Sequence, residues 1–275
     1  MNKKIIWVWG LSFFSFAMAT TLPAEEGKQQ FEGFNLAGYK EGGQKAWDVK
    51  GDTADVVGTT ISLTNIVANV YDNPLINLTA KTGTVDQTNG LIHLEKNVVI
   101  TSETGSQLKT ESLDWERQKD LVKTNDRVVI TDEKATATGT GVVAHPNLKT
   151  AQMNKDVTVK VKTEPEKPNS SVVTITCDGP MEVDQTKQQV VFRKNVVAVQ
   201  EDRKLKADRM ELYFDSETKQ IKELICLGHV VITMGENTSY SEKAVYNAKD
   251  QKLVLSGQPK LILLTEGEGV APFGN

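Results

Sequence analysis

The sequence predicts an antiparallel all-β protein, and three observations point to that class. Short runs rich in β-branched residues recur along the chain, polar turn clusters separate them, and no window after residue 30 carries a long helical apolar stripe. The chain has 275 residues, which is enough for one large domain or two smaller ones. Hairpins between consecutive strands are therefore the expected connections.

The first residues of the chain have the pattern of an export segment. Lys3 and Lys4 precede an uncharged run that ends at Ala19, and Ala17-Met18-Ala19 has the small-x-small pattern of a signal peptidase site. We assign residues 1–19 to a signal peptide. An uncleaved anchor is the alternative, because the apolar run approaches the roughly 18–20 residues that span a bilayer. Both interpretations place the rest of the chain outside the cytoplasm.

The predicted strands follow one another along the remainder of the chain. The clearest apolar runs are Leu91–Leu94, Val128–Thr131, Val157–Val161, Val190–Phe192, Val230–Thr233 and Leu261–Leu264. Turn residues separate them at Asp86–Gly90, Asp184–Lys187, Asp215–Lys219 and Ala248–Gln251. Asn89-Gly90 is a strong hairpin signal, because both residue types tolerate positive φ.

The strands also repeat with a period of about thirty residues. Superposing residues 91–101 on the later segments aligns one polar position, occupied by Asn97, Arg127, Asp156, Asn195, His229 and Gln258. The longest step contains residues 162–171, where two prolines and polar neighbours predict a linker. Three units precede this linker and three follow it.

Alternation within each unit predicts one apolar face and one wet face. The apolar positions are Ile92, Leu94, Val98, Ile100, Val128, Ile130, Met153, Val157, Val190, Phe192, Val196, Leu224, Val230, Ile232, Leu253 and Leu255. Their alternating partners include His93, Glu95 and Arg193. The polar break at residues 95–97 predicts a bend or bulge. A two-strand unit cannot bury its own apolar face, so stacked units must share one interior.

Composition excludes several functional classes. A net charge of −4 gives no basic field for phosphates, so no nucleic-acid partner is expected. Three histidines and two cysteines lack metal-ligand spacing, and we expect no metal and no cofactor. The carboxylates are scattered over wet faces, so no catalytic residue is predicted and the chain is not expected to be an enzyme. Only 6% of the residues are aromatic, which suits a slot lined by small apolar side chains.

Three single residues need separate interpretation. His229 occupies the repeated polar position, so we interpret it as a strand-break residue and not as a ligand or base. Cys177 and Cys226 both share the parity of the apolar face. They could pair as a disulfide in an oxidising compartment or lie buried as free thiols, and the sequence leaves both states open.

The order of several segments resembles the bridge proteins of lipopolysaccharide export. The first half is similar to the LptC family, and the second half is similar to the LptA/OstA family. The LptC-like segments are Gly38–Ala54, Leu78–Lys81, Leu108–Trp115 and Thr138–Ala144; the LptA/OstA-like segments are Ile175–Asp184, Lys194–Val199, Leu205–Tyr213, Gly228–Ile232 and Leu253–Pro259. On this basis we expect an LptC-like module over 30–161, a linker over 162–171 and an LptA/OstA-like module over 172–275.

The resemblance implies a half-open β-jellyroll, in which two antiparallel sheets fold into a V. The groove of the V carries lipid acyl chains, so the apolar positions above become the expected groove lining for lipid A. The resemblance also implies partners: an inner-membrane Lpt ABC transporter, other Lpt bridge proteins and a further copy of the chain, joined head to tail through edge strands. The edges are expected at about 36–50 and 259–270, and the location is the periplasm, with or without an inner-membrane anchor.

Two other functional classes stay open. An extracytoplasmic β-solenoid or sandwich adhesin that binds polysaccharide would have a filled interior and exposed aromatic residues. A carbohydrate-active enzyme on a repetitive β scaffold would need paired acids, which the alternation does not provide.

Overall fold

The computed structural model describes residues 29–71, 74–162, 171–218 and 220–263. Strands make up most of this part of the chain, and no helix within it is long and apolar enough to cross a membrane. The predicted signal segment and nearly all of the predicted linker lie outside the described residues. The first nine strands are β1 (Gln29–Tyr39), β2 (Lys45–Val57), β3 (Thr60–Val70), β4 (Ile76–Asp86), β5 (Leu91–Ser102), β6 (Gln107–Glu116), β7 (Leu121–Thr131), β8 (Ala135–His145) and β9 (Thr150–Lys162). The other eight are β10 (Val172–Cys177), β11 (Met181–Asp184), β12 (Gln189–Gln200), β13 (Arg203–Phe214), β14 (Ile221–Met234), β15 (Asn237–Asn247), β16 (Lys252–Ser256) and β17 (Lys260–Ile262).

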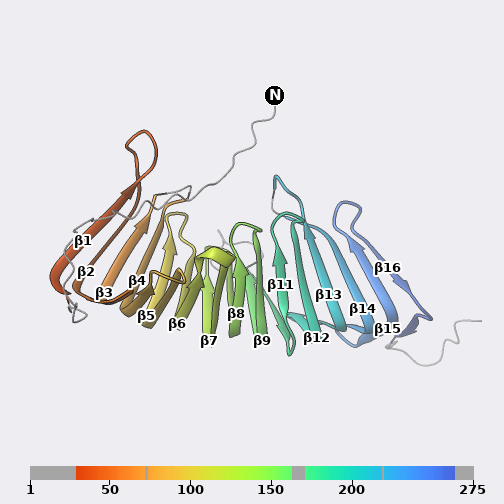
Figure 1. The fold of residues 1–275 in the computed structure, drawn as a ribbon. Coiled ribbons are helices and arrows are strands. Elements are labelled where there is room, and N and C mark those ends of the chain that lie inside the picture. The colour runs from red at the N-terminus through yellow and green to blue at the C-terminus, as the bar shows by residue number, and fades with distance from the viewer. Residues whose placement is uncertain (1–28, 72–73, 163–170, 219, 264–275) are drawn as a thin grey trace, which may run out of the picture.

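All these strands belong to one antiparallel sheet, as the all-β prediction requires (Figure 1). From β1 to β16 each strand pairs with the next one along the chain, except that β10 and β11 together act as one strand between β9 and β12. At the C-terminal end β16 and β17 both pair with β15. The predicted V is therefore made by a single continuous sheet that bends, and not by two separate sheets. The predicted linker does not interrupt it, because Val159 pairs directly with Ile175.

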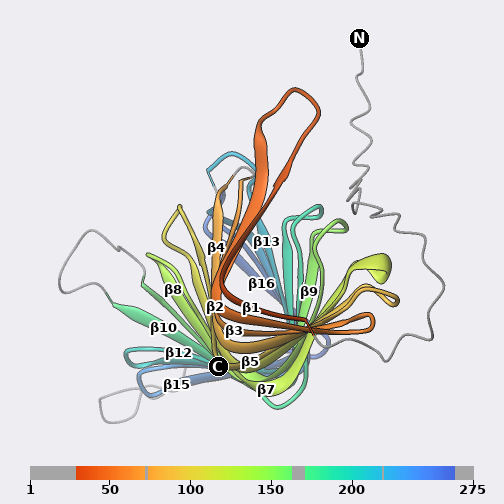
Figure 2. The same ribbon diagram turned by 60° about the vertical axis from the view of Figure 1, so that its left-hand side comes forward.

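The bend falls at the predicted polar position. Five of its six members, Asn97, Asp156, Asn195, His229 and Gln258, have positive φ, between 45° and 59°. The sixth, Arg127, does not, and it pairs with Thr140 beside the register shift of β7 and β8. The pairing register shifts beside them, for example between Glu95 and Val98. A residue in the left-handed region turns the chain without losing the alternation of faces, so the inner residues before and after the bend stay on one side. Viewed nearer to its long axis, the sheet is a trough (Figure 2).

We call the two sides of this trough wall 1 and wall 2. Wall 1 is the part of the sheet that holds Ile92 and Leu224, and wall 2 is the part that holds Ile130 and Ile232. Several hairpins of wall 1 are closed by turns in which an Asp side chain accepts hydrogen bonds from backbone N–H groups two and three residues later. Asp86, for instance, accepts hydrogen bonds from the backbone N–H groups of Thr88 and Asn89 at 2.9 and 3.1 Å. Asp184 and Asp215 repeat this arrangement, which confirms the predicted turns.

The floor of the trough is the driest part of the molecule. Five valines lie there with at most 1% of their surface exposed: Val98, Val128, Val157, Val196 and Val230. Their cross-strand partners are the smaller residues Thr110, Gly139, Cys177, Ala207 and Ser241. Small partners leave room for the sharp bend. At Gly139 an added Cβ would lie 2.3 Å from the sulfur of Met153, so the site accepts no side chain without rearrangement.

Candidate functional site: an apolar trough

The inner face of wall 2 carries one unbroken cross-strand row of side chains. It runs through Leu36, Val49, Ala68, Leu78, Ile100, Leu108, Ile130, Ala137, Val159, Ile175, Ala198, Leu205, Ile232, Ser239 and Leu261. Ser239 is its single polar member. The fourteen intervals, at about 4.8 Å each, give a continuous apolar track of about 67 Å.

Wall 1 carries a second unbroken row opposite the first. Its members are Val56, Ile61, Val85, Ile92, Trp115, Val122, Ala144, Ala151, Val183, Val190, Leu212, Leu224, Tyr246 and Leu253. Both rows cross the region where the predicted modules meet. The inner sides of both walls are therefore almost wholly apolar along the described sheet, and the alternation found in the sequence is the main cause.

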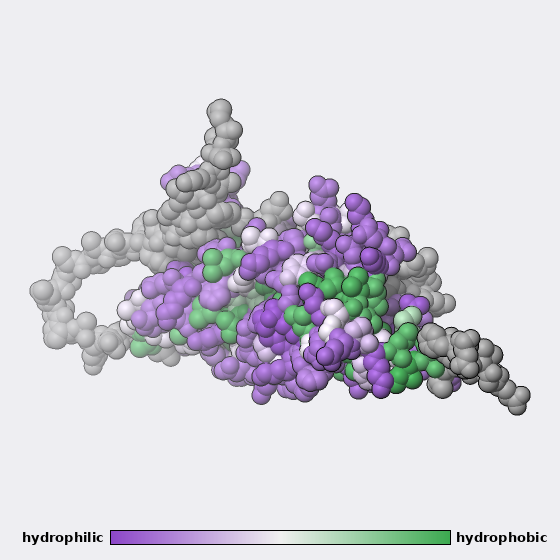
Figure 3. Space-filling model, turned by 90° about the vertical axis from the view of Figure 1, so that its right-hand side faces the viewer, coloured by the Kyte–Doolittle hydropathy of each residue, from purple (hydrophilic) through white to green (hydrophobic). Residues whose placement is uncertain are grey.

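The walls are less buried than the floor. Ile100, Ile130, Val190 and Ile232 are half-buried, although they point inward and no other layer of the protein covers them. Side chains of the two walls thus do not close on each other. Leu36 and Leu261, at the two ends of the wall 2 row, are 53% and 62% exposed. Apolar residues also gather at the β16–β17 end (Figure 3), where Leu253, Leu261 and Ile262 are exposed.

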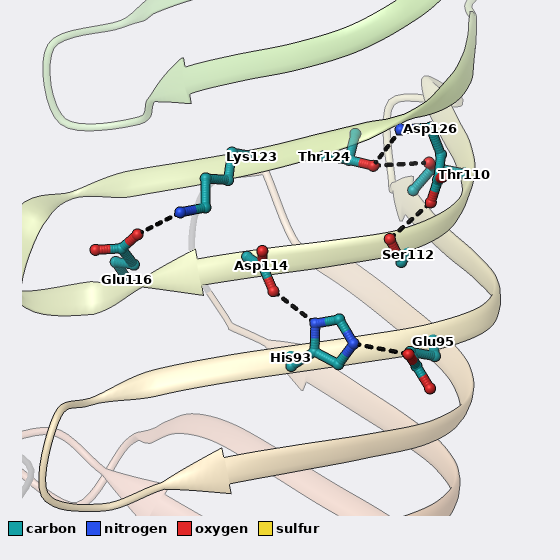
Figure 4. Close-up of polar contacts among 9 residues, drawn as sticks. All are labelled: His93, Glu95, Thr110, Ser112, Asp114, Glu116, Lys123, Thr124 and Asp126. Atoms are coloured by element: carbon teal, nitrogen blue, oxygen red, sulfur yellow. Dashed lines mark hydrogen bonds and ion pairs between the residues drawn. The ribbon is translucent and has the colours of Figure 1, made fainter.

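A polar step divides the floor between β6 and β7. Thr110 and Thr124 are buried, and their hydroxyl oxygens lie 3.4 Å apart (Figure 4). Residues 110–113 and 124–128 have no register partners across this junction, since pairing stops at Lys109 and resumes at Asp114. The buried apolar residues accordingly form two clusters, one from β3 to β6 and one from β7 to β15. The sequence did not predict this step, because both threonines occupy positions that the alternation assigns to the inner face. Only the presence of a hydroxyl group at positions that are otherwise apolar could have indicated it.

The sixteen predicted groove residues all lie on the inner face. Eight are buried: Leu94, Val98, Val128, Met153, Val157, Phe192, Val196 and Val230. Seven are half-buried: Ile92, Ile100, Ile130, Val190, Leu224, Ile232 and Leu255. Leu253 is 46% exposed at the C-terminal edge. The other strand of each unit also contributes inner residues, such as Leu108 and Leu205, which were not predicted. Its inner positions change parity at the bend, from Leu108 to Leu113 and from Leu205 to Met210, so one alternation does not mark the whole strand.

The outer face carries polar clusters with structural roles. The His93 ring lies between two carboxylates, with Nδ1 2.5 Å from Asp114 and Nε2 2.9 Å from Glu95 (Figure 4). Hydrogen bonds to Glu95 and Asp114 raise the pKa of His93. His229 is exposed at the bend with a φ of 45°, which confirms its prediction as a strand-break residue. Within the described ranges, no three acids, histidines or cysteines could hold a metal.

The two cysteines are free thiols in the structure, so the disulfide that the sequence left open is not formed. Cys177 lies on β10 and Cys226 on β14, and strands β12 and β13 separate them in the sheet. Burial raises the pKa of the Cys226 thiol to about 12. Both residues serve as small apolar groups of the floor and wall.

The expected N-terminal edge needs correction. Among the described strands the N-terminal edge is β1, over residues 29–39, and not residues 36–50, because β2 is paired on both sides by β1 and β3. At the other end β16 and β17 lie outside β15, and residues 264–275 are outside the described part. Both edges expose apolar side chains, including Phe31 and Leu36 at one end and Leu253 and Ile262 at the other.

This bent sheet, with an open apolar trough along its length, is a half-open β-jellyroll. Residues 5–162 match the family model for lipopolysaccharide-assembly, LptC-related proteins. The chain belongs to this family. Residues 174–269 match the model for the LptA/LptD N-terminal LPS transport domain, which confirms the predicted order of an LptC-like and an LptA-like half.

Two further comparisons stand beside these family matches without adding to the assignment. No curated protein sequence matches the chain. A solved structure with some similarity is LptH from Pseudomonas aeruginosa, described as the LptA-homologous periplasmic component of the lipopolysaccharide transport device. It is 15% identical, the match covers 59% of this chain and 97% of LptH, and the TM-score is 0.35. The matched families are transport families, so the chain is a bridge-type protein of lipopolysaccharide transport and not a member of an enzyme family.

Proposed function

We propose that this protein carries lipopolysaccharide through the periplasm with the lipid A acyl chains held in its trough. The observation that supports this most is the unbroken inner row from Leu36 to Leu261. A track of that length, open at both ends, suits a ligand that moves along the sheet. The sixteen inward residues predicted from the sequence would form the central part of the lining.

The energetics favour holding a lipid without fixing it. Each methylene removed from water contributes about 0.8 kcal/mol, so part of one acyl chain is held by several kcal/mol. The half-buried wall residues Ile130 and Ile232 are available for this contact, and they offer no directional hydrogen bond. Neighbouring positions along the row therefore have similar affinity. Movement in one direction needs energy from a partner, which in this proposal is the inner-membrane Lpt ABC transporter.

The two edges would connect the protein to its partners. Edge strands β1 and β16–β17 present unpaired backbone groups, and such edges add strands from another chain. Pairing with the transporter complex, another bridge protein or a second copy would place a new strand beside Leu36 or Leu261. The inner row would then continue into the partner. In this arrangement the LptC-like module (30–161) and the LptA-like module (172–275) contribute to one trough, and residues 1–19 direct the chain to the periplasm or anchor it.

A site-specific crosslinking experiment tests the lipid contact. A photoreactive phenylalanine analogue replaces Ile130 or Ile232 on the inner face, and the matched controls carry it at Val129 or Val231, the adjacent outer positions. Irradiation with lipopolysaccharide should give adducts at the two inner positions only. Equal adducts at both faces, or none at the inner positions in folded protein, would contradict the proposal.

The polysaccharide-binding adhesin is the weaker candidate. It requires a filled interior, whereas the inner walls are only half-buried. Few aromatic residues are exposed for sugar stacking, and those at the N-terminal edge, Phe31 and Tyr39, lie on β1 where pairing would cover them.

A further inference from the structure

The outer face of wall 2 has an unusual distribution of charge. Two adjacent cross-strand rows cover this face from β1 to β17. They contain six lysines, Lys50, Lys109, Lys160, Lys204, Lys206 and Lys260, and one acidic residue, Asp48. Asp48 is already engaged by Lys45, Asn69 and Tyr71. We call the six lysines and the surface between them the lysine face.

The outer face of wall 1 is mixed in charge. One cross-strand row there contains Asp55, Asp114, Glu182 and Glu211 with Lys123, and the row beside it contains Arg193, Arg209 and Lys243. Arg193 pairs with Glu182 at 2.9 Å and Arg209 with Glu211 at 2.7 Å. The chain as a whole has a net charge of −4, so the lysine face is a local excess of positive charge and not a sign of a generally basic protein.

The lysines are also regularly spaced. Lys109 is on β6, Lys160 on β9, Lys204 and Lys206 on β13 and Lys260 on β17, with two strands between each of these positions in the sheet. Three strand spacings correspond to about 14 Å. All six lysines are exposed, and within the described residues none of them forms an ion pair. Their ammonium groups are therefore available to an external anion.

The surface between the lysines is rich in hydroxyl and amide groups. Thr101, Gln107, Thr136, Thr174 and Thr238 lie in the same row as Lys160 and Lys204. Gln107 donates to the hydroxyl of Thr101 at 3.2 Å, and all five residues are half-buried, so part of their polar surface is accessible. Such groups can exchange hydrogen bonds with sugar hydroxyls, while lysines bind carboxylates or phosphates.

We propose that the lysine face binds a linear acidic polysaccharide that runs across the strands outside the trough. The shape of the face favours a flexible polymer over a membrane. Strands twist by at least about 10° from one to the next, so the face turns through roughly a right angle between Lys109 and Lys260. The strands of the walls fan out accordingly (Figure 2). A polymer can follow that turn, but a flat bilayer meets only part of it. This site is independent of the lipid trough.

Binding of the purified protein to polygalacturonate, which carries one carboxylate per sugar, tests the proposal. Trigalacturonate and neutral dextran serve as comparison ligands, because a three-sugar chain spans only about one interval between lysines and loses most of the multivalent gain. The polymer should bind in a salt-sensitive way, while the trimer and dextran bind much more weakly. Equal binding of dextran, or a trimer as tight as the polymer per chain, would overturn the proposal.

Matched variants locate the site. Replacing Lys109, Lys160 and Lys204 together by Gln should weaken polymer binding by about tenfold or more, since three regular contacts are lost. The control replaces Lys243, Lys249 and Lys252, exposed on the side of wall 1, by Gln and removes the same charge. It should bind as the native protein does. Equal weakening in both variants would show a net-charge effect and overturn the proposal, as would capture by anionic phospholipid vesicles with no binding of polymer.

Discussion

His229 Nδ1 lies 2.8 Å from a carboxylate oxygen of Asp208 on the neighbouring strand, at the outer side of the bend. The same relationship recurs where Asn195 donates to Asp178 at 2.6 Å and Asn65 donates to Asp52 at 2.5 Å. Each donor has a left-handed backbone. The bend therefore combines a backbone conformation that few residues tolerate with a side-chain bond that holds it to the next strand.

Backbone conformation at the bend gives the first prediction. Asn195 has a φ of 50°, which a β-branched residue tolerates poorly and glycine tolerates well. Asn195→Val should lower the free energy of unfolding by about 1–2 kcal/mol more than Asn195→Gly does. Both variants lose the bond to Asp178, so urea unfolding of the pair isolates the backbone effect. Equal stability of the two variants would contradict this role of the bend.

The His93 cluster gives a pH prediction. Glu95 and Asp114 raise the pKa of His93 above 6.5, so protonation stabilises the folded state. This contribution is complete below the unfolded pKa of 6.5 and disappears as the pH rises through the higher folded pKa. The stability difference between the native protein and His93→Gln should thus be larger at pH 6 than at pH 9. Nuclear magnetic resonance titration should also show that Glu95→Gln lowers the pKa of His93; no change would refute the proposed cause.

The floor of the trough gives a packing prediction. Val128 is fully buried on the inner face, and Val129 is half-buried on the outer face of the same strand. Val128→Ala should reduce the free energy of unfolding by about 2 kcal/mol, because it removes buried methyl groups and leaves a cavity. Val129→Ala should cost clearly less. Thermal or urea denaturation of the two single variants provides the comparison, and a larger loss for Val129→Ala would reverse the assignment of faces.

The two thiols give a chemical prediction. Burial raises the pKa of both Cys177 and Cys226, in the second case to about 12, so neither is a thiolate at neutral pH. A thiol reagent should label neither cysteine in the folded protein, and it should label both in denaturant without prior reduction. Rapid labelling of the native protein, or a need for reductant after unfolding, would disagree with the structure.

Much of this architecture was predictable from the sequence, and the reason is the alternation that β5, β12 and β14 keep on both sides of the bend. Residues such as Ile92 and Ile232 could be assigned to the inner face because a sheet reverses side-chain direction at every residue. The bend was predictable at Asn97 and its equivalents from a repeated polar position. Pairing between distant segments was not, so the single continuous sheet, the position of the free edge and the separation of Cys177 from Cys226 required the structure. The polar step at Thr110 and Thr124 also depends on a register irregularity that no local pattern reveals.

Direct pairing of β9 with β10 and β11 has a practical consequence for dividing the chain. The two family-matched segments meet at residues 162–174, and the family boundaries alone would select this region for dividing the chain. A cut there would separate Val159 from Ile175 and Met153 from Met181. Each fragment would then have an unpaired edge strand with exposed apolar side chains, which promotes aggregation. The halves are consequently poor candidates for separate expression. Replacing one half by that of a related protein would succeed only if the replacement has a strand that pairs with β9, or with β10 and β11, at this junction.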